Sequence, residues 1–175
     1  SLLRQLSSQV GAVYLSHGNR DFLLGEAFAK ETGVILLPDP TLVDLYGRKA
    51  ILTHGDALCT DDLAYQQFRA MVRNPQWQTQ FLTQPLAVRK AIAEDLRRKS
   101  EASKQEKSAA IMDVNAEAVS ALFRQYGSHD LIHGHTHRPA CHAVQIDGAN
   151  CQRWVLPDWY EGKWGYLRCT PSEWQ

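Results

Sequence analysis

The sequence contains no long apolar run and no excess of either charge, and both absences narrow what the chain can do. Its 175 residues include 19 basic and 19 acidic side chains, so we expect no general attraction to nucleic acid. No apolar segment approaches the roughly 20 residues that a membrane-spanning helix requires. A chain of this length is long enough to bury a hydrophobic core as one domain.

Cysteine is also scarce, and its spacing argues against a disulfide framework. The four cysteines form no Cys-x-x-Cys pair and are Cys59, Cys141, Cys151 and Cys169. Free thiols of a cytoplasmic protein are therefore favoured. A pair between Cys141 and Cys151, on facing strands of one hairpin, is the alternative that the spacing leaves open.

The most informative segment is LIHGHTHRP at 131–139, an apolar strand that runs into a glycine turn. His135 and His137 are two residues apart, and positions i and i+2 of an extended segment point to the same side. Both imidazoles can then reach one metal ion or two adjacent ions. By the same alternation His133 faces the opposite way, where packing is its favoured role and support of a metal ligand is the alternative.

Two further segments strengthen the metal interpretation, because each follows a short apolar strand. HGNRD at 17–21 and THGD at 53–56 place Asn and His beside glycines. Parallel strands bring their carboxyl ends to one edge of a sheet, so we predict a single metal site. Imidazole and amide oxygen suit manganese, iron or zinc better than calcium. The candidate ligands are Asn19, His54, His135 and His137.

The hydrophobic pattern alternates between strand and helix periods and predicts an α/β fold. Helices are expected at 2–9, 22–32 and 115–126, and strands at 10–16, 34–37, 42–46, 49–53, 142–146, 152–156 and 164–168. Tyr46-Gly47 and Asp147-Gly148 are expected to turn two hairpins. The helix at 22–32 would open directly after the Asn19 loop and direct its N-terminus at a phosphate.

From residue 61 to about residue 107 the pattern is helical, broken at Pro75 and Pro85. We interpret this block as an inserted cap over the site. It carries apolar positions and the basic residues Arg89, Lys90, Arg97, Arg98, Lys99, Lys104 and Lys107. Such a face is commonly solvated surface, but beside a phosphate site it suits a substrate with two phosphates and an apolar tail. The same face can bind an anionic membrane surface.

The order of the motifs, GNRD, then HGD, then GHTH, resembles the calcineurin-like metallophosphoesterases over the whole chain. The forms HGNRDFL, THGDALCTDD and LIHGHTHRP are similar to members that hydrolyse the diphosphate of a diacylated UDP-glucosamine in lipid A biosynthesis. The products would be UMP and the diacylglucosamine 1-phosphate. The resemblance implies a single domain over residues 1–175, a β-sandwich flanked by helices, with the cap inserted at about 61–107. It also implies a cytoplasmic protein that is peripheral on the inner membrane, and it implies no protein partner.

The resemblance assigns roles residue by residue. The ligands of a two-metal Mn2+ site would be Asn19, His54, His135 and His137. The acylated nucleotide-sugar substrate would contact Asn19, Arg20, Asp62, Ser100, Lys104, Lys107 and His135. Arg20 would act in catalysis, because a guanidinium stabilises charge that builds on phosphoryl oxygens. For Asp62 the residues alone leave a helix N-cap equally open.

A pair of divalent cations needs a bridging carboxylate beyond these ligands. Asp21 and Asp56 each lie two residues from a proposed ligand, but neither is placed as an obvious bridge. The superfamily takes its bridging Asp from a Gly-Asp motif on the second strand, after an Asp-x-His motif on the first. This sequence has neither motif on such a strand, so we expect the first strands of the fold to be missing.

Two alternative functions remain open at this point. One is another calcineurin-like phosphoesterase that acts on a phosphodiester or a dinucleotide polyphosphate. The other is a fragment that binds nucleotide or lipid without hydrolysing either.

Overall fold

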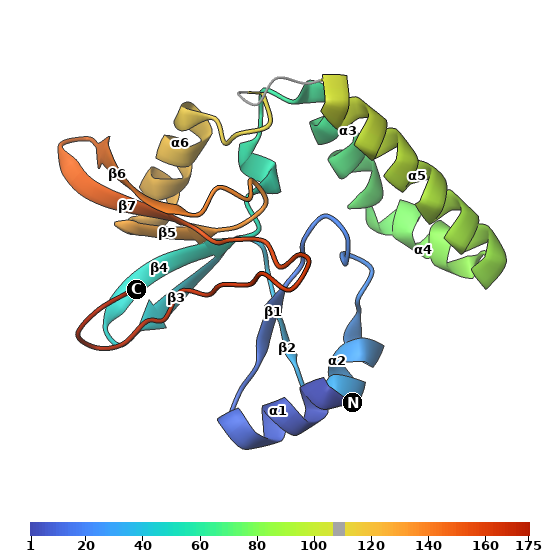
Figure 1. The fold of residues 1–175 in the computed structure, drawn as a ribbon, viewed down its shortest axis with the longest axis horizontal. Coiled ribbons are helices and arrows are strands. Elements are labelled where there is room, and N and C mark those ends of the chain that lie inside the picture. The colour runs from blue at the N-terminus through green and yellow to red at the C-terminus, as the bar shows by residue number, and fades with distance from the viewer. Residues whose placement is uncertain (107–110) are drawn as a thin grey trace. The chain divides into compact units, whose positions relative to one another are not determined.

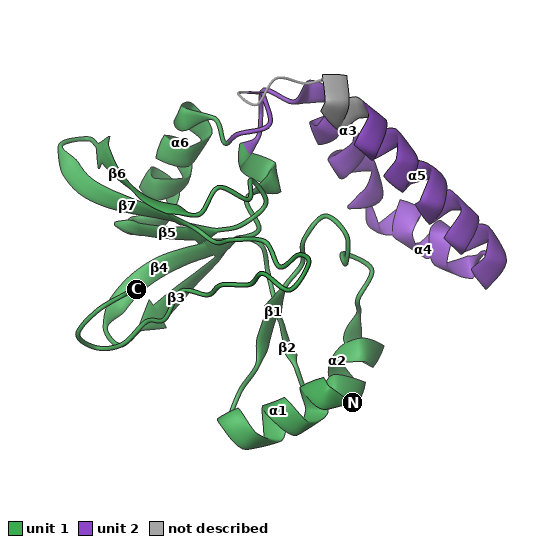
Figure 2. Cartoon of the chain, in the orientation of Figure 1, with its two compact units in different colours: residues 1–58, 114–175 green, residues 59–113 purple. Residues whose placement is uncertain are grey.

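A helical insertion divides the chain into two units. In the computed structural model, which describes residues 1–106 and 111–175, the first unit comprises residues 1–58 and 114–175 and the second residues 59–113 (Figure 2). The second unit corresponds closely to the block predicted at 61–107, and its role as a cap stays a prediction. The α/β class predicted from the sequence is confirmed.

The first unit is built on a five-stranded mixed sheet (Figure 1). In spatial order its strands are β3 (Thr41–Leu45), β4 (Arg48–Thr53), β5 (Asp130–His133), β7 (Ala149–Val155) and β6 (Ala140–Ile146). The three central strands β4, β5 and β7 are parallel, and β3 and β6 pair antiparallel at the two edges. A separate parallel sheet joins β1 (Tyr14–Ser16) to β2 (Ile35–Leu37). All the carboxyl ends of the central strands therefore lie at one edge.

Both predicted hairpins are confirmed. Tyr46 and Gly47, which join β3 to β4, have φ values of 60° and 86°. Asp147 and Gly148, which join β6 to β7, have φ values of 51° and 83°. Two consecutive residues with positive φ form the turn whose twist matches that of the flanking strands.

The core of the first unit lies between the sheet and α6 (Ala116–Tyr126). Phe123 of α6 is 1% exposed and belongs to one apolar cluster with Ile51 and Leu131 of the sheet. Asn115 caps the helix as predicted, since its Oδ1 accepts hydrogen bonds from the backbone N–H groups of residues 117 and 118. The helix ends at Gly127 in the left-handed conformation, also as predicted.

The helix predicted at 22–32 begins later than expected. α2 spans Glu26–Thr32, and its N-cap is Gly25, which has no side chain to bond the first turn. The residues before it form a turn that the Leu24 N–H closes on the Asp21 carbonyl at 2.9 Å. The expectation that this helix opens directly after the Asn19 loop is therefore wrong. The first helix, α1 (Leu2–Val10), extends one residue into the predicted strand.

The second unit contains three helices, α3 (Leu63–Val72), α4 (Pro75–Thr83) and α5 (Leu86–Glu106). The breaks fall at the two predicted prolines, where Pro75 is the first residue of α4. On α5 the exposed Asp95 pairs with Arg98 at 2.5 Å and with Lys99 at 2.7 Å. Part of the basic face is therefore occupied by local ion pairs.

Two expectations for the C-terminal part are wrong or decided against. The strand predicted at 164–168 does not form: beyond β7 the described residues make only the isolated bridges Tyr160–Lys163 and Cys169–Trp174. Glycines and prolines interrupt this segment, and the backbone passes so close that a Cβ on Gly165 would lie 2.7 Å from a proline ring. All four cysteines are free thiols. In the described part of the chain no helix has the length and apolar character to cross a membrane.

A buried carboxylate anchors the other edge of the sheet, where the parallel strands begin. Asp130, 4% exposed at the start of β5, accepts two hydrogen bonds from the guanidinium of Arg48, one of them 2.6 Å from Nε. It also accepts one from Trp154 Nε1 at 3.3 Å. The bond to Asp130 raises the pKa of Arg48 above its ordinary value. Arg48 in turn lies 3.9 Å from the ring centroid of Trp174.

We predict that Arg48→Met lowers the free energy of unfolding by about 1–3 kcal/mol, because it removes the main partner of a buried carboxylate. Adding Asp130→Asn should recover part of the loss, since the remaining group is then neutral. Arg124→Met is the matched control: its partner Asp147 is exposed, so the change should be below about 1 kcal/mol. Urea unfolding measures all three, and equal small effects at both arginines would contradict the anchor.

Candidate functional site

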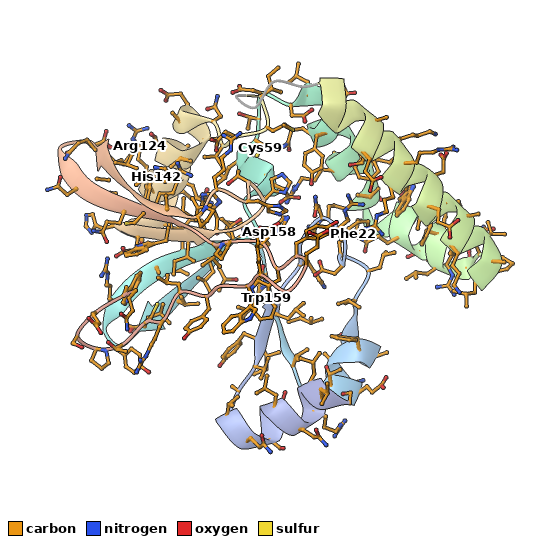
Figure 3. The ribbon with its side chains drawn as sticks, viewed as in Figure 1. Phe22, Cys59, Arg124, His142, Asp158 and Trp159 are labelled. Carbon is orange, nitrogen blue, oxygen red and sulfur yellow. The ribbon has the colours of Figure 1, made fainter. Side chains whose placement is uncertain are left out.

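The parallel register of three strands places their ends side by side. Thr53 of β4 pairs with His133 of β5, and His133 pairs with Val155 of β7. The chain therefore leaves the sheet at one level three times, toward His54, toward the His135 loop and toward Asp158 (Figures 1 and 3). This is the edge at which open α/β sheets bind their ligands.

His54 and His135 meet at this edge. Their ring centroids are 5.0 Å apart and their planes are inclined at 68°, so both rings can reach one cation. The backbone fixes their spacing, because the Gly134 N–H donates to the His54 carbonyl at 3.1 Å. The His54 N–H donates to Asp39 Oδ1 at 3.0 Å. This pair is the part of the predicted metal site that the structure brings together.

The Asn19 loop reaches the same place from the smaller sheet. A Cβ on Gly18 would lie 3.0 Å from Cε1 of His54, so the loop backbone rests directly on the imidazole. The Gly18 N–H donates to Asp21 Oδ1 at 2.6 Å and closes the loop. Asn19 and the exposed Arg20 are therefore carried by a loop in contact with His54. Asp21 serves here as a loop-closing acceptor.

The geometry of His135 and His137 differs from the prediction. β5 ends at His133, and both later histidines lie in a turn with φ values of 65° and 54°, not in an extended strand. The alternation argument for their shared direction is therefore wrong. Left-handed backbone at two non-glycine residues costs about 1–3 kcal/mol each and is typical of functional sites. His137 Nδ1 lies 3.4 Å from Asp158 Oδ2.

The donor chemistry of this edge fits a cation in part. Two imidazoles converge, and the buried hydroxyl of Thr136 between the two turn histidines has no hydrogen-bond partner among the described residues. Within residues 1–106 and 111–175, however, no group of three or more His, Cys, Asp or Glu side chains could hold a metal ion. Asp56, considered as a bridging ligand, is fully buried in the short helix η1 (Asp56–Leu58).

The remaining predicted substrate contacts belong to the second unit. Asp62 caps α3, where its Oδ1 accepts the Tyr65 N–H at 3.0 Å, so the capping alternative is confirmed. Ser100 is half-buried on α5. Lys104 lies on α5 with its side chain outside the description, and Lys107 lies outside the described residues. Their contacts with substrate stay predictions.

Asp158 was not among the predicted site residues. It follows β7 by three positions on the segment that carries the exposed Trp159 (Figure 3). The rule that selected His54 and His135, a polar residue just beyond a parallel strand, would also have selected Asp158. It was missed because β7 was expected only as half of a hairpin, with no parallel neighbour.

Comparison with known proteins identifies the chain's relatives. No family model matches it. It is 54% identical over 166 residues to the UDP-2,3-diacylglucosamine hydrolase of Aromatoleum aromaticum, covering 95% of this chain and 67% of the relative. Proteins of the same name from Bordetella pertussis and Stenotrophomonas maltophilia are 57% and 48% identical, covering 84% and 98% of this chain.

The chain spans 57% of the length of the Bordetella relative and 72% of that from Stenotrophomonas. Identity near one half, continuous through the loops that bring His54 and His135 together, exceeds what a shared fold alone requires. The chain therefore belongs to the UDP-2,3-diacylglucosamine hydrolase family.

Proposed function

We propose that this chain carries substrate-binding and metal-binding residues of an enzyme that hydrolyses UDP-2,3-diacylglucosamine to UMP and 2,3-diacylglucosamine 1-phosphate in lipid A biosynthesis. The observation that carries the proposal is the His54–His135 pair, 5.0 Å apart at the ends of adjacent parallel strands. The names of the relatives supply the substrate. The β3–β7 sheet covered by α6, together with the separate β1–β2 sheet, supports a calcineurin-like metallophosphoesterase sandwich.

The proposed metal ligands are Asn19, His54, His135 and His137, with Mn2+ as the cation. When bound, such a cation polarises phosphoryl oxygen and makes water nucleophilic near neutral pH. Arg20 is exposed on the loop that rests on His54. Its guanidinium can bind two phosphoryl oxygens at once and stabilise their growing negative charge without being deprotonated.

The second unit provides the chemistry for a lipid-linked substrate. Leu82, Leu86 and Val88 are all exposed by 42–58%, and the basic Arg89 and Lys90 follow at once. Such a combination suits an acyl chain next to a phosphate. It also suits peripheral binding to an anionic leaflet on the cytoplasmic face of the inner membrane, where each well-placed cation contributes about 1 kcal/mol.

We predict that residues 1–175 bind Mn2+ weakly, because two imidazoles and an amide lack the bridging carboxylate of a two-metal site. Replacing His54 or His135 by Ala should raise the dissociation constant about 10-fold or more. His129→Ala, at an exposed histidine outside this edge, should leave it unchanged. Electron paramagnetic resonance of free Mn2+ measures binding. Equal affinities in all four proteins would refute the shared site.

We predict negligible release of UMP by residues 1–175 alone. Supplying a segment that carries the Asp-x-His and Gly-Asp motifs should raise the rate about 100-fold or more, because it adds the bridging ligand. The restored enzyme should prefer UDP-2,3-diacylglucosamine to unacylated UDP-glucosamine and to a dinucleotide polyphosphate. Rapid metal-dependent turnover by residues 1–175 alone would overturn the ligand assignment, and equal rates on the three substrates would overturn the substrate assignment.

Lys104 and Lys107 are predicted to bind the diphosphate. In an active preparation their double replacement by Ala should raise KM about 10-fold, because two point charges on phosphate are lost, while the metal content stays the same. The matched control is Lys90→Ala with Lys99→Ala, which removes the same charge from the same helix. Loss of metal with activity, or an equal effect in the control, would show that the two lysines have another role.

A further inference from the structure

His133 is the largest polar side chain buried at the ligand edge of the sheet. It is 1% exposed, at the last position of β5. In register it stands between Thr53 of β4 and Val155 of β7, the last residues of the two neighbouring strands. A histidine enclosed on all sides at the level where three strands end is in position to influence each departing loop.

The hydrogen bonds of the ring define its orientation and its tautomer. Arg153 Nη1 lies 3.0 Å from His133 Nε2, and a guanidinium can only donate, so Nε2 is the acceptor. Nδ1 therefore carries the hydrogen and donates it to the carbonyl of Gly134 at 2.9 Å. The ring thus joins a side chain of β7 to the first peptide of the His135 turn.

The other face of the ring supports the loop that carries His54. A Cβ on Gly55 would lie 2.8 Å from His133 Nδ1 and 3.3 Å from the Gly134 carbonyl oxygen. Gly55 also has a φ of +102°, a conformation that side chains rarely adopt. The backbone just after His54 can therefore lie against this imidazole only because residue 55 is glycine.

The main chain of the same residue completes the link. The His133 carbonyl accepts the Leu156 N–H at 2.7 Å, just beyond β7. The next N–H, that of Gly134, donates to the His54 carbonyl. One residue thus contacts all three loops that leave this edge of the sheet.

We propose that His133 is a positioning residue that sets the separation of His54 and His135, and so prepares both rings to bind the same cation. The proposal rests on the proposed function only in taking those two histidines as metal ligands. It also explains how the left-handed turn at His135 is held, since a strained backbone persists only where its surroundings fix it. An apolar residue of the same volume fills the space but makes neither ring hydrogen bond.

The test uses His133→Phe, His133→Asn and His133→Gln, with His129→Gln as the matched control. The first readout needs no metal: amide hydrogen exchange at Gly134 and Thr136, whose N–H groups are bonded within this turn. His133→Phe should speed exchange there about 10-fold relative to the core amides of Ile51 and Leu131. The second readout is the Mn2+ dissociation constant, which should rise about 10-fold.

Partial rescue separates a positioning role from simple packing. Asn retains a donor near the place of Nδ1 and Gln an acceptor near the place of Nε2, so both variants should fall between the parent and His133→Phe. Gly55→Ala, which drives a methyl group into the ring, should reproduce the local exchange. Uniformly faster exchange throughout the sheet, or no change at Gly134 and Thr136, would overturn the proposal. If the parent chain binds no Mn2+, the metal assignment fails, and the exchange measurement alone still decides the role of His133.

Discussion

The parallel pairing of β4, β5 and β7 is the constraint on which the rest of the structure depends. It fixes Thr53, His133 and Val155 at one level, and with them the points at which three loops leave the sheet. His54 and His135 are 81 residues apart in the sequence, so only this pairing brings them together. The apolar cluster that holds α6 against the sheet stabilises the pairing, because Ile51 and Leu131, both fully buried, belong to neighbouring parallel strands.

The two ends of these strands serve opposite purposes. At the amino end, Arg48 and Trp154 satisfy the buried carboxylate of Asp130 in a compact network with no strained backbone. At the carboxyl end, His135 and His137 adopt left-handed conformations that cost free energy. This division is what α/β folds show in general, with stability built at one edge of the sheet and ligands bound at the other.

The features that the sequence predicted correctly are those set by local chemistry. The hairpin at Tyr46-Gly47, the cap at Asn115 and the helix start at Pro75 depend on a few adjacent residues, and the motif order was enough to select His54 and His135. The features that it missed depend on distant contacts. The left-handed turn at His135 follows from packing against β4 and β7, and Asp158 enters the site only because β7 lies beside β5. Neither relation leaves a periodic trace in the sequence.

The unusual backbone of the His-x-His turn explains why a buried histidine, and not an aliphatic residue, ends β5. An extended continuation would send the residue after Gly134 away from β4, whereas the turn brings its ring within 5.0 Å of His54. A turn of this kind needs an acceptor and a donor held inside the protein, and hydrogen bonds there are strengthened by the low local dielectric. His133 offers one of each, and Gly55 lets it lie close to the neighbouring loop. The separation of the two outer histidines is therefore a consequence of the one that lies behind them.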